Sequence, residues 1–120
     1  MALTELYTIP ARIGGAGPIH VIYGSLGAAT DETIYSPAAD KTAFLIGALV
    51  SEGSATNMTF KSGSETIAIL ELAANQGIWD KINSGVIMAA EEGEDLVANP
   101  SVAVSAATFF VIEASSLVFD

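Results

Sequence analysis

The sequence predicts an all-β protein, a small antiparallel sandwich or jelly roll of about eight strands with an extended N-terminal arm. Short apolar segments recur between residues 41 and 113, and small turns rich in glycine, serine and acidic residues separate them. The two longest segments, 41–51 and 102–113, are apolar on both alternating sets of positions. Such strands are covered on both faces, by the core on one side and by a neighbour on the other.

Composition limits the classes of function. The chain has 120 residues, enough for one domain, and 51% of them are hydrophobic while only 15% are charged. A body this small cannot hide so much apolar material, so some of it is expected to face another subunit or a partner. There is no cysteine, which excludes disulfides and thiolate zinc sites. The net charge is -10 and the four basic residues are scattered, so neither nucleic acid nor an anionic membrane is an expected partner.

The first 18 residues differ from the rest. A short apolar run is broken by Pro10 and followed by the glycine-rich segment 14–17. We therefore expect an extended arm over 1–18 and a β-sandwich domain over 19–120, with a frayed terminus as the alternative. No basic, apolar leader and no apolar stretch of membrane-spanning length is present, so we expect synthesis in the cytoplasm and no membrane partner.

The strands of the first half follow in order. Apolar runs predict strands at 19–23, 32–35 and 41–51. Residues 56–61 alternate cleanly, which is typical of a half-solvated strand. Residues 65–75 fit two structures, because a capping box at 62–65 and helical spacing compete with a run of β-forming isoleucines. A strand at 65–72 is favoured and a helix stays open.

In the second half of the chain, a long connection separates the predicted strands. A long connection that contains Trp79 is expected over 73–84, and a strand over 85–90. An acidic turn leads into a strand at 95–98, which Asn99-Pro100 is expected to end. Residues 102–113 form the last long strand.

Chemistry-bearing residues are few. His20 is the only histidine and has no cysteine or second histidine to share a metal, so we interpret it as an ordinary strand residue. The acidic segment 91–95 is expected to solvate a turn, and ion binding there is left open. A hydrolase would need facing carboxylates, for example Glu71 with Asp80, and nothing in the sequence pairs them. We therefore expect no enzyme, no catalytic residue, no metal and no cofactor.

The order of segments in the middle and end of the chain supports a family resemblance. The segments are the Phe44–Leu49 strand, the 59–63 turn, 72–77, 93–96 and the closing strand 108–113. In this order they resemble the head decoration, or cement, proteins of tailed bacteriophages, which have a β-sandwich body. The family often has a glycine at the opening of the last strand, where this chain has Ala106-Ala107. The resemblance implies a homotrimer on the outer capsid surface of a virion, bound to the major capsid protein and stabilising the shell, with no active site.

Two sets of residues are the candidates for such contacts. The arm is expected to bind the capsid, by adding a strand to a sheet edge, through Leu3, Leu6, Tyr7 and Ile9. The doubly apolar strands are expected to supply the subunit interface through Phe44, Leu45, Ile46, Leu49, Phe109, Phe110 and Val111. The alternative is a phage tail or fibre-tip sandwich module that binds a host glycan on the rings of Trp79, Tyr7, Tyr23 and Tyr35.

Overall fold

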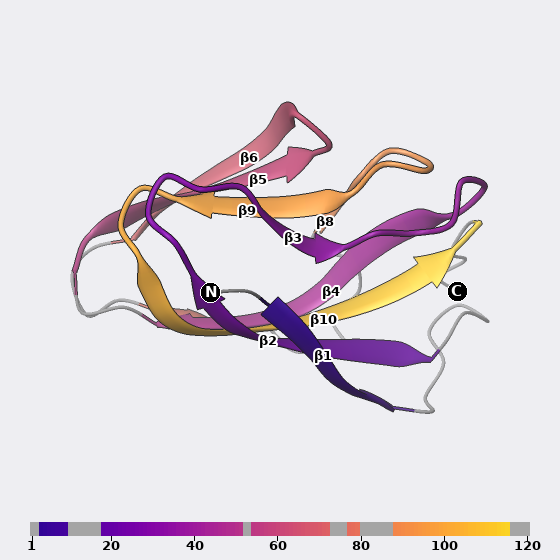
Figure 1. The fold of residues 1–120 in the computed structure, drawn as a ribbon, viewed down its shortest axis with the longest axis horizontal. Coiled ribbons are helices and arrows are strands. Elements are labelled where there is room, and N and C mark those ends of the chain that lie inside the picture. The colour runs from indigo at the N-terminus through magenta and orange to yellow at the C-terminus, as the bar shows by residue number, and fades with distance from the viewer. Residues whose placement is uncertain (1–2, 10–17, 52–53, 73–76, 80–87, 116–120) are drawn as a thin grey trace.

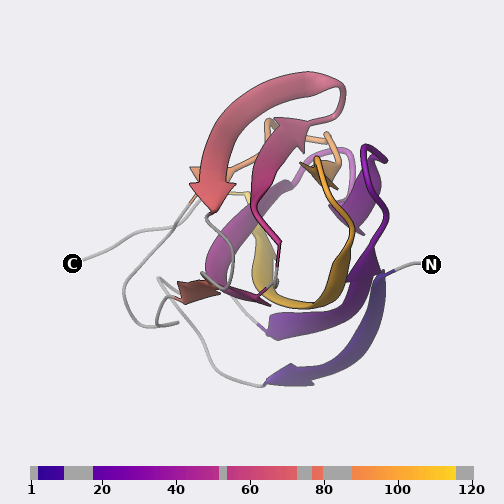
Figure 2. The same cartoon turned by 90° about the vertical axis from the view of Figure 1, so that its left-hand side faces the viewer.

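The protein is a two-layer antiparallel β structure (Figures 1 and 2). A computed structural model of the chain describes residues 3–9, 18–51, 54–72, 77–79 and 88–115. The first sheet has the order β1-β2-β10-β4, and two short strands, β7 and β8, pair with the far side of β4. The second sheet has the order β3-β9-β5-β6. No helix occurs within these described ranges, and the predicted all-β fold is confirmed.

The ten described strands divide between the sheets as follows. The first sheet contains β1 (Leu3–Ile9), β2 (Ile19–Leu26), β4 (Thr42–Ser51), β7 (Gly77–Trp79), β8 (Met88–Ala89) and β10 (Val104–Ala114). The second contains β3 (Glu32–Tyr35), β5 (Thr56–Ser62), β6 (Glu65–Leu72) and β9 (Leu96–Pro100).

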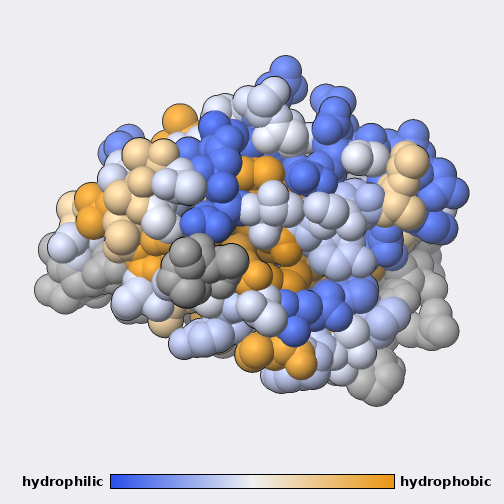
Figure 3. Space-filling model, in the orientation of Figure 1, coloured by the Kyte–Doolittle hydropathy of each residue, from blue (hydrophilic) through white to orange (hydrophobic). Residues whose placement is uncertain are grey.

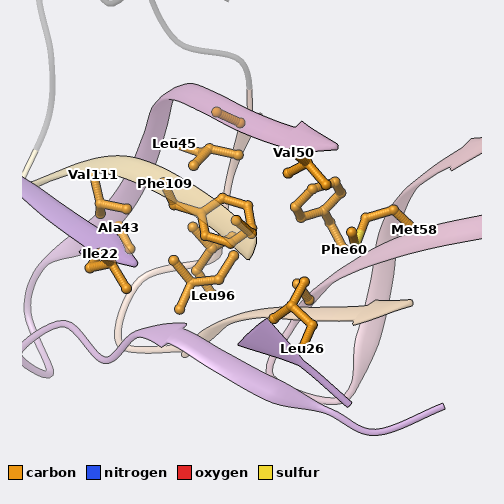
Figure 4. Close-up of a cluster of buried hydrophobic side chains, with 14 of the residues drawn as sticks. Ile22, Leu26, Ala43, Leu45, Val50, Met58, Phe60, Leu96, Phe109 and Val111 are labelled. Carbon is orange, nitrogen blue, oxygen red and sulfur yellow. The ribbon is translucent and has the colours of Figure 1, made fainter. Parts of the chain in front are cut away.

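The main core lies between the two sheets (Figure 4). The rings of Phe60 and Phe109, one from each sheet, meet edge to face with centroids 6.3 Å apart. Leu45 and Leu96 are fully buried beside them. Each such side chain stabilises the fold by roughly 1.5–3 kcal/mol when it leaves water. Hydrophobic residues of this interior are visible in the middle of the face drawn in Figure 3.

A second apolar cluster lies on the outer face of the first sheet. Along β10, Phe109 and Val111 join the main core, while Phe110 and Ile112 belong to the second cluster. In β4 a register shift opposite Phe110 and Val111 places Ile46 in the same outer cluster. The doubly apolar pattern is therefore explained by two clusters, and Ile46 and Ile112 are both 0% exposed within one chain.

The structure resolves one open choice and differs from two predictions. The segment 65–72 is a strand, as favoured, and residues 73–75 lie outside the described residues. A strand, β7, lies inside the predicted connection. β9 runs through to Pro100 instead of ending before it, because the ring closes the strand where its missing N–H interrupts little of the ladder. The Pro100 carbonyl accepts a hydrogen bond from Ala29 N at 2.7 Å.

The N-terminal residues also lie elsewhere than expected. Residues 3–9 form β1, which pairs antiparallel with β2 at the edge of the first sheet, so this part of the predicted arm lies on the sandwich. Leu3 packs against the main core, which anchors the strand. A register shift between Glu5 and Tyr7 places Leu6 at a bulge. Residues 10–17 of the predicted arm lie outside the described residues.

Candidate functional site

An exposed apolar surface covers part of the outer face of the first sheet. We call it the outer patch and define it as Leu6, Tyr7, Tyr23 and Leu49. Leu6 and Tyr7 are each 55% exposed, Tyr23 is 44% exposed and Leu49 is 38% exposed. Large apolar side chains gathered on one face are typical of surfaces that bind other molecules.

Strand register places three of the four outer-patch residues, Tyr7, Tyr23 and Leu49, on the same face. Tyr23 lies opposite Thr108, and Thr108 lies opposite Leu49, which makes one row across β2, β10 and β4. Tyr7 lies opposite Val21, two residues from Tyr23 along β2. Diagonal neighbours of this kind lie roughly 7–8 Å apart, within reach of aromatic side chains. The two tyrosine rings are thus presented on the same face.

Three of the four residues expected to bind a capsid have described side chains, and these differ in exposure. Leu6 and Tyr7 are exposed and belong to the outer patch. Leu3 is half-buried against the main core. Ile9 pairs with Ile19 in the β1–β2 ladder, but the structure does not describe the side chain of Ile9. Among the described side chains of this set, Leu6 and Tyr7 are the exposed ones and stay candidates for docking on a partner.

Burial corrects the expected subunit interface. Leu45, Phe109 and Val111 are 0% exposed in the main core, and Ile46 is equally buried in the second cluster. These four side chains cannot contact another subunit in this structure, because the chain's own fold already surrounds them. Phe44 and Phe110 are half-buried against the second cluster, and Leu49 is exposed. The sequence pattern could not separate a neighbour within the chain from a neighbour outside it.

A polar cluster that the sequence did not predict joins the two sheets. His20 of β2 contacts the Glu5 carboxylate of β1 through Nδ1 at 3.0 Å. Its Nε2 lies 3.4 Å from the Tyr35 hydroxyl of β3, and the two rings lie in contact, tilted by 43°, at a centroid distance of 4.8 Å. The Tyr35 hydroxyl donates to Glu113 of β10 at 3.0 Å. Glu5 and His20 are 15 residues apart and Tyr35 and Glu113 are 78 apart, so no local motif announces the cluster.

The hydrogen-bond partners in this cluster indicate which of its atoms carry a hydrogen. Ionised carboxylates only accept hydrogen bonds, so Glu5 requires a hydrogen on His20 Nδ1, and Glu113 takes the single hydrogen of Tyr35. His20 Nε2 can then contact the Tyr35 oxygen favourably only as a donor. All three hydrogen bonds are satisfied together when both imidazole nitrogens carry hydrogen. With a neutral imidazole, His20 and Glu113 compete for the same tyrosine hydrogen.

The environment of Tyr35 keeps its hydroxyl protonated. Burial raises the pKa of Tyr35 to about 12, helped by the hydrogen bond to Glu113 and by the negative charges of Glu113 and Glu5. An activated tyrosine nucleophile would need a lowered pKa instead. The cluster therefore acts here as a hydrogen-bonded tie between the sheets, and the prediction that the chain is not an enzyme stays a prediction.

The acidic turn is held by backbone contacts. The Glu91 N–H donates to Ser62 Oγ at 2.8 Å, and the Gly93 N–H donates to the Lys41 carbonyl at 2.8 Å. The Gly63 N–H donates to the Asp95 carbonyl at 2.8 Å, which fastens this turn to the β5–β6 hairpin. Across the described residues no group of three or more His, Cys, Asp or Glu side chains could hold a metal ion.

The remaining predicted residues fall on different surfaces. Tyr35 faces the opposite sheet and does not share a surface with Tyr7 and Tyr23. The side chain of Trp79 lies outside the description. Glu71 is exposed on β6, and Asp80 is not among the described residues, so the pair considered for a hydrolase is not brought together by anything described.

Three comparisons with known proteins found no match for the chain. No protein-family model, no curated protein and no solved structure matches it. None of the residues that the structure describes forms a helix long and apolar enough to cross a membrane.

Proposed function

We propose that the chain is a structural protein of a virion, a homo-oligomeric decoration protein that binds the outside of a phage capsid and stabilises the shell. The outer patch is the observation that carries the proposal. Its side chains Leu6, Tyr7 and Tyr23 remain exposed although the chain builds two buried clusters elsewhere. Apolar and aromatic side chains in such a setting are the usual anchors of protein contacts.

In this proposal, residues in and beside the outer patch take two roles. Leu6 and Tyr7 lie on the edge strand β1 and bind the major capsid protein. Leu49, with the half-buried rings of Phe44 and Phe110, supplies the subunit contacts that remain after the correction above. A trimer places three copies of β1 around one axis, so that weak single contacts add through multivalency.

Two measurements test the proposal. Light scattering at micromolar concentration is expected to give three times the 12.3 kDa mass of the chain. Co-sedimentation with empty capsids built from the major capsid protein of the same genome is expected to show binding. The double variant Leu6→Ser/Tyr7→Ser should lose at least about ten-fold in capsid affinity. The matched control Thr4→Ser/Thr8→Ser, on exposed positions of the same strand, should bind as the parent does. A stable monomer that stays in the supernatant when the capsids sediment would refute the proposal.

The second candidate function is binding of a host glycan, which two exposed tyrosines on one face favour. The double variant Tyr7→Leu/Tyr23→Leu separates the candidates. Leucine keeps the apolar area that a protein partner needs, but it removes the rings that stack on a sugar. Capsid binding that survives this change supports decoration. Binding of host surface polysaccharide by the parent, lost in the variant, supports the glycan module instead.

A further inference from the structure

The second sheet ends in an exposed strand, β6 (Glu65–Leu72), whose edge-protecting features are confined to two glutamates and an irregularity near its start. Within the described part of the chain β6 pairs on one side only, with β5. Residues 68–72 keep continuous register with β5, so the strand is regular over this stretch. The segment contains neither lysine nor proline, the residues that commonly block an edge. Figure 1 shows β6 at the outer margin of the second sheet.

Apolar side chains line this edge. Ile69 is 59% exposed and shares the outer face with Thr59, its partner on β5. Ile67 and Leu70 are each 37% exposed. Leu70 lies opposite the fully buried Met58, at the rim of the main core. An added strand would therefore meet backbone groups along its length and apolar side chains on both faces.

The charge around the edge is acidic. Glu65 and Glu71 lie on β6 itself, and both are exposed. The carboxylate of Glu94 comes close to Gly63 in the adjoining hairpin. The one basic residue of β5, Lys61, is already paired with Asp31 at 2.9 Å, and Asn99 donates to the same carboxylate at 2.7 Å. Among the described residues, the edge therefore presents an apolar centre with negative charge at both ends, and no basic side chain pairs with either glutamate.

A second copy of the chain fits this edge poorly. In the antiparallel register that places Ile67 of one copy opposite Ile69 of the other, Glu65 faces Glu71 at both ends. Like charges directly opposite each other destabilise a strand pair. Each copy also carries a net charge of -10, which adds repulsion. Charge complementarity therefore favours a different partner.

We propose that β6 is a docking edge that accepts an extended segment of another protein, with apolar residues at alternate positions and lysine or arginine at its ends. The segment adds a fifth strand to the second sheet. Backbone hydrogen bonds supply affinity, Ile69 and Leu70 select the apolar positions, and Glu65 and Glu71 select the basic ends. The proposal does not rest on the decoration function, because the outer patch lies on the other sheet.

Fluorescence anisotropy with defined peptides tests the proposal. The probe is a labelled peptide of alternating valine and threonine with lysine at both ends, compared with the same peptide ending in glutamate. We expect the lysine peptide to bind at least about ten-fold more tightly at low salt, and the double variant Glu65→Lys/Glu71→Lys to reverse this preference. N-methylation of alternate peptide amides should abolish binding, because it removes the donors of a strand ladder.

Matched variants locate the contact. Ile69→Thr, which keeps a β-forming residue, should weaken binding several-fold, while Leu49→Thr on the other sheet should not change it. Equal binding of the lysine and glutamate peptides, or binding that survives N-methylation, would overturn the proposal. A dimer of the chain alone that dissociates in Ile69→Thr would also overturn it, since a second copy would then occupy the edge. None of these outcomes depends on capsid binding.

Discussion

The hydroxyl of Tyr35 donates a hydrogen bond of 3.0 Å to the carboxylate of Glu113, and this bond joins β3 of the second sheet to β10 of the first. The other oxygen of Glu113 accepts from the Ala38 N–H in the loop that follows β3. A single carboxylate thus fixes both the end of a four-residue strand and the loop after it. The contact closes one end of the sandwich, where the apolar core gives way to the polar cluster.

The raised pKa of Tyr35 predicts a loss of stability in alkali. The unfolded tyrosine ionises near pH 10, whereas the folded one holds its proton to a pKa of about 12. Between these values the folded state binds more protons than the unfolded state, so the free energy of unfolding falls as pH rises. The stabilisation is complete below pH 10 and is lost by about pH 12.

Urea unfolding across this pH window checks the prediction. The fall should be shallower in Tyr35→Phe, which has no hydroxyl to ionise. Tyr23→Phe on the exposed outer patch serves as the control and should follow the parent. A Tyr35→Phe curve parallel to that of the parent would show that another group causes the loss.

Thr56 at the start of β5 is predicted to be a strong polar contributor to stability. Its side chain is 3% exposed, and Oγ1 accepts from the Val102 N–H at 3.1 Å. Thr56→Val keeps the shape but leaves that N–H without its acceptor, which costs about 1–3 kcal/mol. Thr59→Val, on the outer face of the same strand, should change the free energy of unfolding by less than about 0.5 kcal/mol. Chemical denaturation of both variants gives the comparison, and similar losses at the two positions would contradict it.

Much of the fold could be predicted from the sequence because strand patterning is local. The alternation of Met58 and Phe60, and the apolar run of β4, identify strands without knowledge of their neighbours. The bounds were harder, since Pro100 can end a strand or stand as its last residue. The pairing of residues 3–9 with β2 was not predicted, because it is a tertiary contact. The glycine-rich segment that follows these residues favoured an extended arm instead.

The candidate site was less predictable because burial and clustering are properties of the whole fold. The pattern of β10 marks both faces as covered, but it does not say that Phe110 and Ile112 are covered within the same chain. The polar cluster forms because β3 faces β10 across the sandwich. The positions of His20, Tyr35 and Glu113 in the sequence do not predict that contact between the sheets. Leu6 and Tyr7 were identified because they belong to a short apolar run that Pro10 ends, although the sequence did not separate them from the half-buried Leu3.

Ala29, in the turn between β2 and β3, is predicted to be replaceable by glycine with a gain in stability. Its φ of 49° lies in the left-handed region, which costs a residue with a Cβ roughly 1–2 kcal/mol. Glycine relieves that strain but adds about 0.4–1 kcal/mol of unfolded-state entropy, so a small net gain should remain. Thermal unfolding should show a higher midpoint for Ala29→Gly and a lower one for Ala28→Gly, whose φ is not positive. Lower midpoints for both would mean that the turn relaxes around Ala29.

Gly93 in the acidic turn is predicted to be intolerant of any side chain. Its φ is +77°, and a Cβ there would lie 2.9 Å from the Ala39 carbonyl oxygen, a backbone atom that cannot turn aside. Gly93→Ala should therefore lower the free energy of unfolding by about 2–3 kcal/mol, from conformational strain and the displaced loop together. Its N–H also holds the Lys41 carbonyl at 2.8 Å, so the same displacement loosens the start of β4.

Gly63 provides the matched control for this loss. Its φ is +61°, but a Cβ there would meet only the flexible carboxylate of Glu94, at 2.8 Å. That side chain can rotate away, so Gly63→Ala should cost only the left-handed strain of about 1–2 kcal/mol. Urea midpoints of the two variants, measured side by side, should therefore differ, with Gly93→Ala the lower. If Gly63→Ala proves as damaging, then the Glu94 carboxylate is fixed in place, and the acidic turn is more rigid than its exposure implies.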